Sequence, residues 1–302
     1  MLNTPVVLLI YRRPEPTRRV FEAIAAAKPQ KLFVVADGPR LPTDVSLCRA
    51  ARDITEMVDW PCEQHRHYSD DNMGCKRRVI SGLDWVFAQC DEAIILEDDC
   101  VPHPTFFDYC QQLLDFYRDD HRVFSVCGAA FFPHPAQYSY TFSRYPEIWG
   151  WATWKRAWQT YDADMSNWCD LRKTDWLYRL LGSRPAARFW REVFDSAYAG
   201  DIDTWDYQWI FSSWLQGALA AIPNTNLVTN VGFGPDATHT RETTTLAHRP
   251  ASPIELPLRH PPEPVADRWL DVHAERELFG ITYKGFVYRT LRVRLRRLLK
   301  GY

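Results

Sequence analysis

Short apolar runs alternate with amphipathic segments along roughly the first 120 residues of the chain. Strands are expected at 6–11, 31–36, 65–68 and 93–96. Helices are expected at 16–27, from 43 or 44 to 58, at 76–90 and at 104–119. Four strand–helix units in succession are typical of a parallel sheet that is covered by helices, so the pattern predicts an α/β protein.

The pattern becomes less regular from residue 124 onward. One more strand is expected at 124–127, and residues 138–160 are aromatic and are expected to be irregular. The remaining predicted elements are helices at 155–161, 175–181, 186–198 and 207–216 and strands at 219–222 and 226–230. A proline-rich segment, 250–264, is expected to be extended and to wrap over the surface.

The last predicted helix, 283–299, places six Arg and Lys side chains from Arg289 to Lys300 among apolar residues. A basic amphipathic terminus of this kind can make peripheral contact with an anionic membrane surface. It can equally pack its apolar face on the protein and leave its charges in water. Both interpretations are open from the sequence.

The amino-acid composition limits which classes of protein the chain can belong to. Apolar residues make up 46% of the 302 residues, and the formal net charge is −2, which does not favour a nucleic-acid partner. The chain starts without an export signal and has no run of 18 apolar residues, so a cytoplasmic protein is expected, with peripheral contact to the inner membrane as an extension. Eight scattered cysteines without a CxxC pair then indicate reduced thiols rather than a disulfide framework. The 13 Trp side chains suit either a core or sugar stacking.

The main candidate for chemistry is the run Glu97-Asp98-Asp99, which follows directly on the buried strand around Ile94. Open α/β sheets bind ligands at the carboxyl ends of their strands. Three adjacent carboxylates there repel one another unless a cation neutralises them, and oxygen ligands favour Mg²⁺ or Mn²⁺. The run therefore predicts a divalent metal beside a phosphorylated substrate. The alternative is a solvated acidic loop.

Several blocks in this order resemble the GT-A-fold glycosyltransferases. Glu97-Asp98-Asp99, followed by Pro104 and Phe106-Phe107-Asp108-Tyr109, looks like the Glu-Asp-Asp form of the DxD motif in N-acetylglucosaminyltransferase I. Further blocks resemble the bacterial glycosyltransferase-2-like proteins that are often labelled hemolytic-protein-like. These blocks are Asn72-Met73-Gly74-Cys75-Lys76, Gly150-Trp151-Ala152-Thr153-Trp154, Asn230-Val231-Gly232-Phe233-Gly234 and Thr238-His239-Thr240.

The resemblance implies a single GT-A, Rossmann-like domain with a mixed, mostly parallel sheet flanked by helices. This domain would span 1–240, with a nucleotide-sugar half at 1–128 and an acceptor half at 129–240, and a helical tail would follow at 241–302. The implied activity is that of an inverting, metal-dependent glycosyltransferase. It would move a hexosyl or N-acetylhexosaminyl group from a nucleoside-diphosphate donor, with UDP the expected nucleotide. The acceptor would be a glycan or lipid-linked glycan in bacterial surface polysaccharide biosynthesis.

On the donor side, the resemblance implies that Asp99 binds Mn²⁺ (manganese) or Mg²⁺ at the diphosphate, with His239 as a further metal or phosphate ligand. Glu97 and Asp98 would then face sugar and ribose hydroxyls. Asp37 would contact the base through the uracil imide. Asp37-Gly38 is also an ordinary turn, and a loop histidine such as His239 is often merely exposed.

Other donor-side candidates are cations and an aromatic side chain. Arg12 and Arg13 end the first strand, where either guanidinium could reach the diphosphate or stay solvated. Lys76, next to Arg77, follows a glycine turn and could face phosphate or lie on an ordinary helix surface. Trp151, with Trp149 and Trp205, could stack on a sugar or belong to the core.

An inverting transferase needs a carboxylate that removes a proton from the acceptor hydroxyl. Asp206, in Trp205-Asp206-Tyr207-Gln208-Trp209, resembles the base site of N-acetylglucosaminyltransferase I, although Tyr207 replaces its second acid. Asp203 is the second candidate. Asp206 could instead serve the helix dipole alone.

Two other classes compete with the transferase. A sugar nucleotidyltransferase would need a glycine-rich loop after the first strand, and the turn after that strand contains no glycine. A non-catalytic sugar-binding protein would use the Trp residues without needing Asp99 and Asp206 together.

Overall fold

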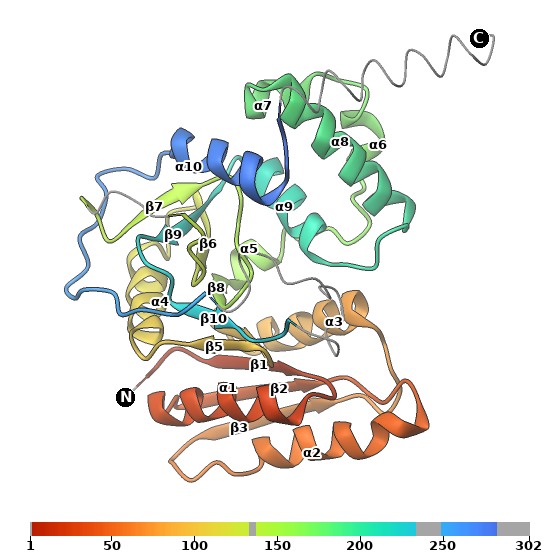
Figure 1. Ribbon diagram of the computed structural model, residues 1–302, viewed down its shortest axis with the longest axis vertical. Coiled ribbons are helices and arrows are strands. Elements are labelled where there is room, and N and C mark those ends of the chain that lie inside the picture. Colours follow the sequence, from red (N-terminus) through yellow and green to blue (C-terminus); the bar gives the residue numbers. More distant parts are fainter. Residues whose placement is uncertain (1, 133–136, 234–248, 283–302) are drawn as a thin grey trace.

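The computed structural model describes residues 2–132, 137–233 and 249–282 (Figure 1). The expected C-terminal helix, 283–299, and His239 lie outside these ranges. Within them, no helix is both long enough and apolar enough to cross a membrane. All eight cysteines lie in these ranges, and none of them forms a disulfide in the structure.

One mixed sheet organises the molecule, with the strand order β3-β2-β1-β4-β8-β6-β9-β7. Neighbours are parallel from β3 to β4 and between β6 and β9, whereas β8 and β7 run antiparallel to their neighbours. The mixed sheet flanked by helices confirms the predicted α/β class. The eight strands are β1 (Val6–Ile10), β2 (Lys31–Ala36), β3 (Glu63–Tyr68), β4 (Glu92–Glu97), β6 (Val123–Cys127), β7 (Tyr140–Ser143), β8 (Trp151–Trp154) and β9 (Leu219–Pro223).

Helices cover both faces of this sheet, and a two-stranded sheet lies beside it. The helices are α1 (Pro14–Ala27), α2 (Val45–Thr55), α3 (Cys75–Phe87), α4 (Thr105–Phe116), α5 (Lys155–Trp158), α6 (Trp168–Leu171), α7 (Trp176–Leu181), α8 (Arg184–Ala199), α9 (Asp206–Leu215) and α10 (Arg268–His273). The small sheet pairs β5 (Cys100–Pro102) with β10 (Val228–Asn230). A 3-10 turn, Pro42–Asp44, precedes α2, and a π-helical turn, Ala274–Leu278, follows α10.

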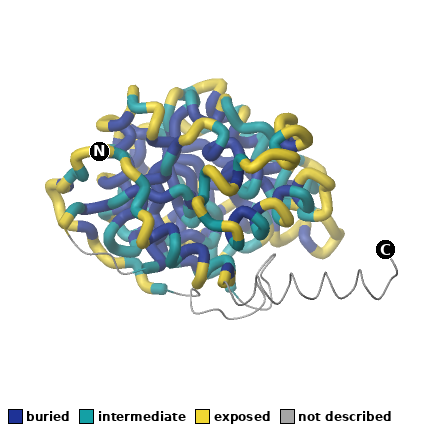
Figure 2. Tube along the Cα trace, turned by 90° about the horizontal axis from the view of Figure 1, so that it is seen from above, coloured by how far each residue is buried: buried dark blue, intermediate teal, exposed yellow. Residues whose placement is uncertain are grey.

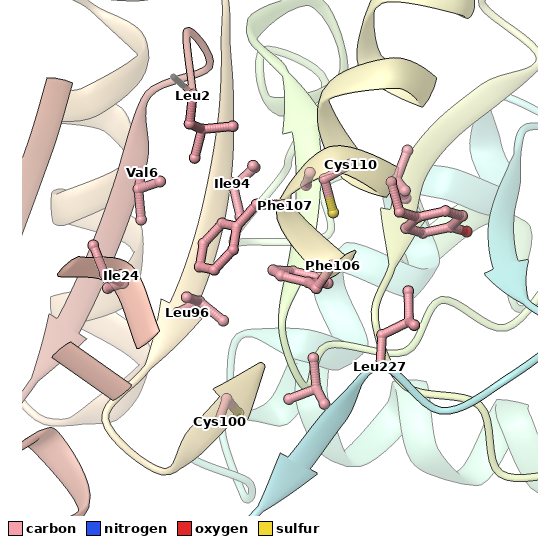
Figure 3. Close-up of a cluster of buried hydrophobic side chains, with 14 of the residues drawn as sticks. Leu2, Val6, Ile24, Ile94, Leu96, Cys100, Phe106, Phe107, Cys110 and Leu227 are labelled. Atoms are coloured by element: carbon pink, nitrogen blue, oxygen red, sulfur yellow. The ribbon is translucent and has the colours of Figure 1, made fainter. Parts of the chain in front are cut away.

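Successive residues of the buried strands serve opposite faces of the sheet. In β1, Val6 and Leu8 join the core formed with α1, α2 and α4, whereas Val7 and Leu9 join the core formed with α3, α5 and α9. This is the period of two that side chains follow along a strand. Figure 3 shows Phe106 and Phe107 of α4 beside the β4 strand in the first of these cores. Because both faces are covered, the central strands can be almost entirely apolar.

A third core lies between α6, α7, α8 and α9, at the end of the molecule away from α1 and α2 (Figure 1). Trp168, Trp190 and Trp214 are buried there, and the segment after α10 closes it with Ile281. Nine of the 13 Trp side chains are buried, so core packing accounts for most of the tryptophan content. Figure 2 shows the buried trace filling the interior and the exposed trace around it.

The prediction for 138–160 was wrong, because this stretch contributes two strands to the main sheet. Strand β8 is inserted antiparallel between β4 and β6, and β7 forms the edge next to β9. By contrast, the proline-rich segment 250–264 contains no helix or strand and has bends at 256–257 and 262–263. It packs on the domain through Ile254 and Leu258, which are buried.

Candidate active site

The carboxyl ends of β1, β2 and β4 open onto a cavity of about 890 Å³, within the range of small-molecule sites. The turns after these strands form one wall. A second wall consists of Trp149 and residues 203–206 at the start of α9, and Asn230, Gly232 and Phe233 also line the cavity. The cavity therefore lies where ligands bind in open α/β sheets.

The acidic run lies on the strand-end wall as the sequence predicts. Glu97 is the last residue of β4, and Asp98 and Asp99 form the turn into β5. Burial raises the pKa of Glu97 to about 8, and the neighbouring Asp99 and Asp98 carboxylates add to the effect. The strand end therefore disfavours a further negative charge, because the neighbouring carboxylates repel it and buried groups lose the stabilisation that water gives to a charge.

Arg13 lies against two of these acids. Its Nη2 donates to Asp98 Oδ1, and its Nη1 is 2.9 Å from Asp99 Oδ2. Asp98 also accepts a 3.3 Å hydrogen bond from the backbone N–H of Tyr11, so this carboxylate holds the β1 turn against the β4 turn. The two acids keep the pKa of Arg13 well above its usual value, although burial acts in the opposite direction.

Arg12 points elsewhere. Its Nη1 is 2.5 Å from Asp44 Oδ1, and Asp44 also accepts from the Tyr11 hydroxyl at 3.1 Å and from the Leu41 N–H at 3.0 Å. Arg12 lowers the pKa of the Asp44 carboxyl. In the described residues the two adjacent arginines thus contact different acids. Arg12 pairs with Asp44, and Arg13 pairs with the acidic run.

Asp37, at the end of β2, is surrounded by hydrogen-bond donors from the chain itself. Oδ1 accepts from the N–H groups of Gly38 and Met73, both at 2.9 Å. Oδ2 accepts from Asn72 Nδ2 at 3.0 Å and from the Gly74 N–H at 3.2 Å. A carboxylate has about four acceptor positions, so these contacts occupy the group. Asp37 holds the turn that leads into α3.

The segment that follows β10, residues 231–233, passes very close to the acidic run. The Val231 N–H donates to the Asp99 carbonyl at 2.8 Å, and the Gly232 N–H donates to Asn230 Oδ1 at 2.8 Å. A Cβ atom on Gly232 would lie 1.9 Å from Asp99 Oδ2. Only glycine lets the backbone approach this carboxylate so closely.

Asp203 and Asp206 both belong to the second wall of the cavity. Asp206 is the first residue of α9, and its Oδ1 accepts from the Thr204 hydroxyl and from the Tyr207 N–H at 2.8 Å. The thiol of Cys75, at the start of α3, has its pKa raised to about 12 by burial and then by Glu97, Asp206, Asp203 and Asp37. These four acids come from three separate segments, the ends of β2 and β4 and the start of α9, and all of them act on one atom in the cavity wall.

Two sequence candidates lie outside the cavity lining. Lys76 Nζ donates to the Ala163 carbonyl at 3.3 Å on the side of α3 that faces the segment after α5. Trp151 is 1% exposed and stacks on Trp205, with ring centroids 5.5 Å apart and an interplanar angle of 21°. Trp149 and Trp205 do line the cavity, and Trp151 packs against Trp205 and Trp209.

The cavity also contains side chains that sequence reasoning missed, chiefly Arg78, Arg40, Asn72 and Asn230. Arg78 is 5% exposed and donates to the His67 carbonyl. It shares the buried stripe of α3 with Gly82 and Val86, four and eight residues further on. A cation at that helical spacing on an otherwise apolar stripe is a signal that could have revealed Arg78.

The charges of the lining bear on the predicted metal. The lining contains seven carboxyl groups and four guanidinium groups, an excess of three acidic side chains. No three His, Cys, Asp or Glu side chains converge as a preformed metal centre in the parts of the chain that the structure describes. Mg²⁺ is commonly held by one or two carboxylates together with substrate phosphates. Oxygen donors from Glu97 and Asp99 fit a metal that arrives with a diphosphate.

Comparisons with known proteins add little to this geometry. No family model matches the sequence, and no curated protein matches it by sequence. Similar solved structures include the galactosyltransferase LgtC in complex with donor and acceptor sugar analogues, at 10% identity, 72% and 73% coverage of the two chains and a TM-score of 0.38. HddC from Yersinia pseudotuberculosis is 8% identical over 51% of this chain and 77% of its own, with a TM-score of 0.34.

A 4-diphosphocytidyl-2C-methyl-D-erythritol synthase from Anaerococcus prevotii is also similar, at 10% identity, 52% and 75% coverage and a TM-score of 0.33. These identities and TM-scores assign no activity to the chain. The chemistry of its own cavity has to carry the functional conclusion.

Proposed function

We propose that the protein is an inverting, metal-dependent glycosyltransferase of the GT-A type. It takes a sugar from a nucleoside-diphosphate donor, with UDP the favoured nucleotide, and transfers it to a glycan or lipid-linked acceptor in bacterial surface polysaccharide assembly. The observation that carries the proposal is the convergence of the Glu97–Asp99 run with Asp206. The end of β4 brings the Glu97–Asp99 run to the cavity, where Glu97 is buried, and the start of α9 brings Asp206 to the same cavity.

The strand-end wall is the donor side in this proposal. Asp99 and Glu97 are the carboxylates that would hold Mn²⁺ or Mg²⁺, which supplies charge stabilisation for the departing diphosphate when it is bound. Arg13 is placed to donate to diphosphate oxygens. Asp98 acts indirectly, because its oxygens hold Arg13 and the backbone of Tyr11.

The helix-start wall is the acceptor side. Asp206 is the proposed base, which takes the proton from the acceptor hydroxyl as that oxygen attacks the anomeric carbon. The N-terminus of α9 stabilises a carboxylate at this position, and the Thr204 and Tyr207 donors fix its orientation. Asp203 lies on the same wall and is the second candidate. Trp149 supplies an aromatic surface for a sugar ring.

The nucleotidyltransferase alternative has less support. The turn between β1 and α1 has no glycine and places the Arg13 side chain over the acidic run, so its backbone does not form a glycine-rich phosphate cradle. Pyrophosphate release from a nucleoside triphosphate and a sugar phosphate would nevertheless identify such an enzyme directly.

The test is calorimetric binding of UDP, GDP, CDP and ADP, each with and without Mn²⁺. It is run on the wild type, on Asp99→Asn and on the control Asp108→Asn, since Asp108 is an exposed acid in the first turn of α4 and does not line the cavity. We expect one nucleotide to bind wild type and Asp108→Asn only with metal, and to be lost in Asp99→Asn. Absence of binding by every nucleotide would remove the proposed donor site and would favour a sugar-binding protein.

A further inference from the structure

Arg13 is shared between two carboxylates that differ in their surroundings. The Asp98 side chain is 4% exposed and has a second donor, the Tyr11 N–H, whereas the Asp99 side chain is 13% exposed and borders the cavity. The Arg13 side chain is itself 20% exposed. One nitrogen of the guanidinium is therefore anchored in the interior, and the other lies on the acid that is open to a ligand.

We propose that Arg13 is an internal cation that holds Asp99 until a metal–diphosphate binds and is then exchanged for the metal. Nη2 stays on Asp98, and Nη1 leaves Asp99 and donates to the diphosphate. The identity of this ligand rests on the proposed function. The exchange itself rests on the contact between Arg13 and the two acids.

The exchange makes metal and nucleotide binding depend on each other. A metal that arrives alone must displace Nη1 from Asp99 and leaves that N–H group without an acceptor, which is costly for a charged group in a partly buried site. A metal that arrives with a diphosphate brings new acceptors for the same N–H group. Arg13 therefore opposes binding of the free metal and supports binding of the metal–nucleotide complex.

The segment after β10 restricts how this exchange can occur. A Cβ atom on Gly232 would lie 3.0 Å from Arg13 Nη1 and 1.9 Å from Asp99 Oδ2, so the backbone is packed directly against the ion pair. A ligand then has to reach Asp99 from the cavity side, where Nη1 is already oriented. The neighbouring Arg12 cannot substitute, because its guanidinium is held by Asp44.

The experiment measures free Mn²⁺ by electron paramagnetic resonance during titration of the protein, first without and then with the nucleoside diphosphate that binds best. Arg13→Gln is compared with the matched control Arg12→Gln, which removes the same charge one residue away. Arg13→Lys is included because it keeps the charge and guards against misfolding of the Gln variant. Thermal melting checks that each variant is folded.

We expect Arg13→Gln to bind Mn²⁺ alone about tenfold more tightly than wild type and to bind Mn²⁺ with nucleotide about tenfold more weakly. Arg12→Gln should stay close to wild type for Mn²⁺ alone. Arg13→Lys keeps the charge but has a single nitrogen for the two acids, so it should lie between wild type and Arg13→Gln. Opposite shifts in the two states cannot come from general damage to the site, which would weaken both.

The inference is overturned if Arg13→Gln and Arg12→Gln change the affinity for Mn²⁺ alone equally, or if Arg13→Gln weakens it. In either case nucleotide binding to the wild type would leave the proposed function standing. Tighter Mn²⁺ binding in Arg13→Gln, combined with no nucleotide binding by any form, would support the exchange and contradict the transferase. The two failures are therefore distinguishable.

Discussion

Strands β3, β2, β1 and β4 all run parallel, and a helix joins each strand to the next one along the chain. Strands β8, β6, β9 and β7 mix directions and are assembled from distant stretches between residues 123 and 223. The first half ends in turns whose charged side chains meet at one edge. The second half supplies the tryptophans of a buried core, and the start of its helix α9 supplies Asp206 in the second wall of the cavity. The comparison shows that each half contributes one side of the cavity.

Because the two halves supply different walls of the cavity, a substitution in one wall should impair sugar transfer without impairing nucleotide binding. Asp206→Asn keeps the shape of the helix start but removes the proton acceptor, so transfer should fall about 10²- to 10⁴-fold. Nucleotide binding in the presence of Mn²⁺ should stay close to that of wild type, because the strand-end wall is untouched. Parallel measurement of sugar transfer and calorimetric binding checks both. A loss of binding equal to the loss of transfer would contradict the division.

The two tryptophans of the second half should respond differently to truncation. Trp151 is buried against Trp205, so Trp151→Ala should lower the free energy of unfolding by about 3–5 kcal/mol. Trp149 is only half-buried and faces the cavity, so Trp149→Ala should cost less stability and should weaken ligand binding instead. Urea denaturation and calorimetry on both variants test this. Equal destabilisation by the two variants would remove the distinction.

Gly232 connects the segment after β10 to the strand-end wall. A methyl group there overlaps Asp99, so Gly232→Ala should displace the carboxylate and cost about 1–3 kcal/mol of stability. Metal-dependent nucleotide binding should weaken at the same time. Thermal unfolding and nucleotide titration measure the two effects, and wild-type binding in this variant would show that Asp99 is not needed where the structure places it.

The smallest expected effect concerns the pKa of the Cys75 thiol, which acids of both walls raise. The Cys75 thiol has a pKa of about 12 because burial and four nearby acids disfavour the thiolate. Alkylation of Cys75 should therefore be slow at pH 8 and should rise with pH. Asp206→Asn removes one of the negative charges, lowers this pKa and should accelerate alkylation by up to about tenfold. Mass spectrometry of the labelled peptide at several pH values measures the alkylation rate. Identical pH profiles in the wild type and in Asp206→Asn would show that Asp206 does not affect the pKa of Cys75.

Local patterns predicted the parallel half of the sheet well. The strands β1, β2 and β4 follow from continuous apolar runs, and the position of Glu97 follows from the abrupt change from apolar to acidic residues. Strand β8 was missed because its four residues pair with strands far away in sequence, and no local period marks so short a segment.

The roles of neighbouring side chains were harder to predict. Arg12 and Arg13 are equivalent in the sequence, yet Arg12 meets Asp44 and Arg13 meets Asp98 and Asp99. Their divergence depends on where the Pro42–Asp44 turn lies in three dimensions. Trp149 and Trp151 are likewise distinguished only by tertiary packing, which places one in the cavity wall and the other in the core.

The central claim is that the end of β4 and the start of α9 enclose one metal–nucleotide site. The most direct measurement is the anomalous diffraction of Mn²⁺ in crystals grown with the nucleoside diphosphate that binds best. The account predicts one strong anomalous peak within coordination distance of an Asp99 carboxylate oxygen, with the diphosphate between it and the wall that carries Asp206. A peak at another place, or nucleotide bound outside this cavity, would contradict the account.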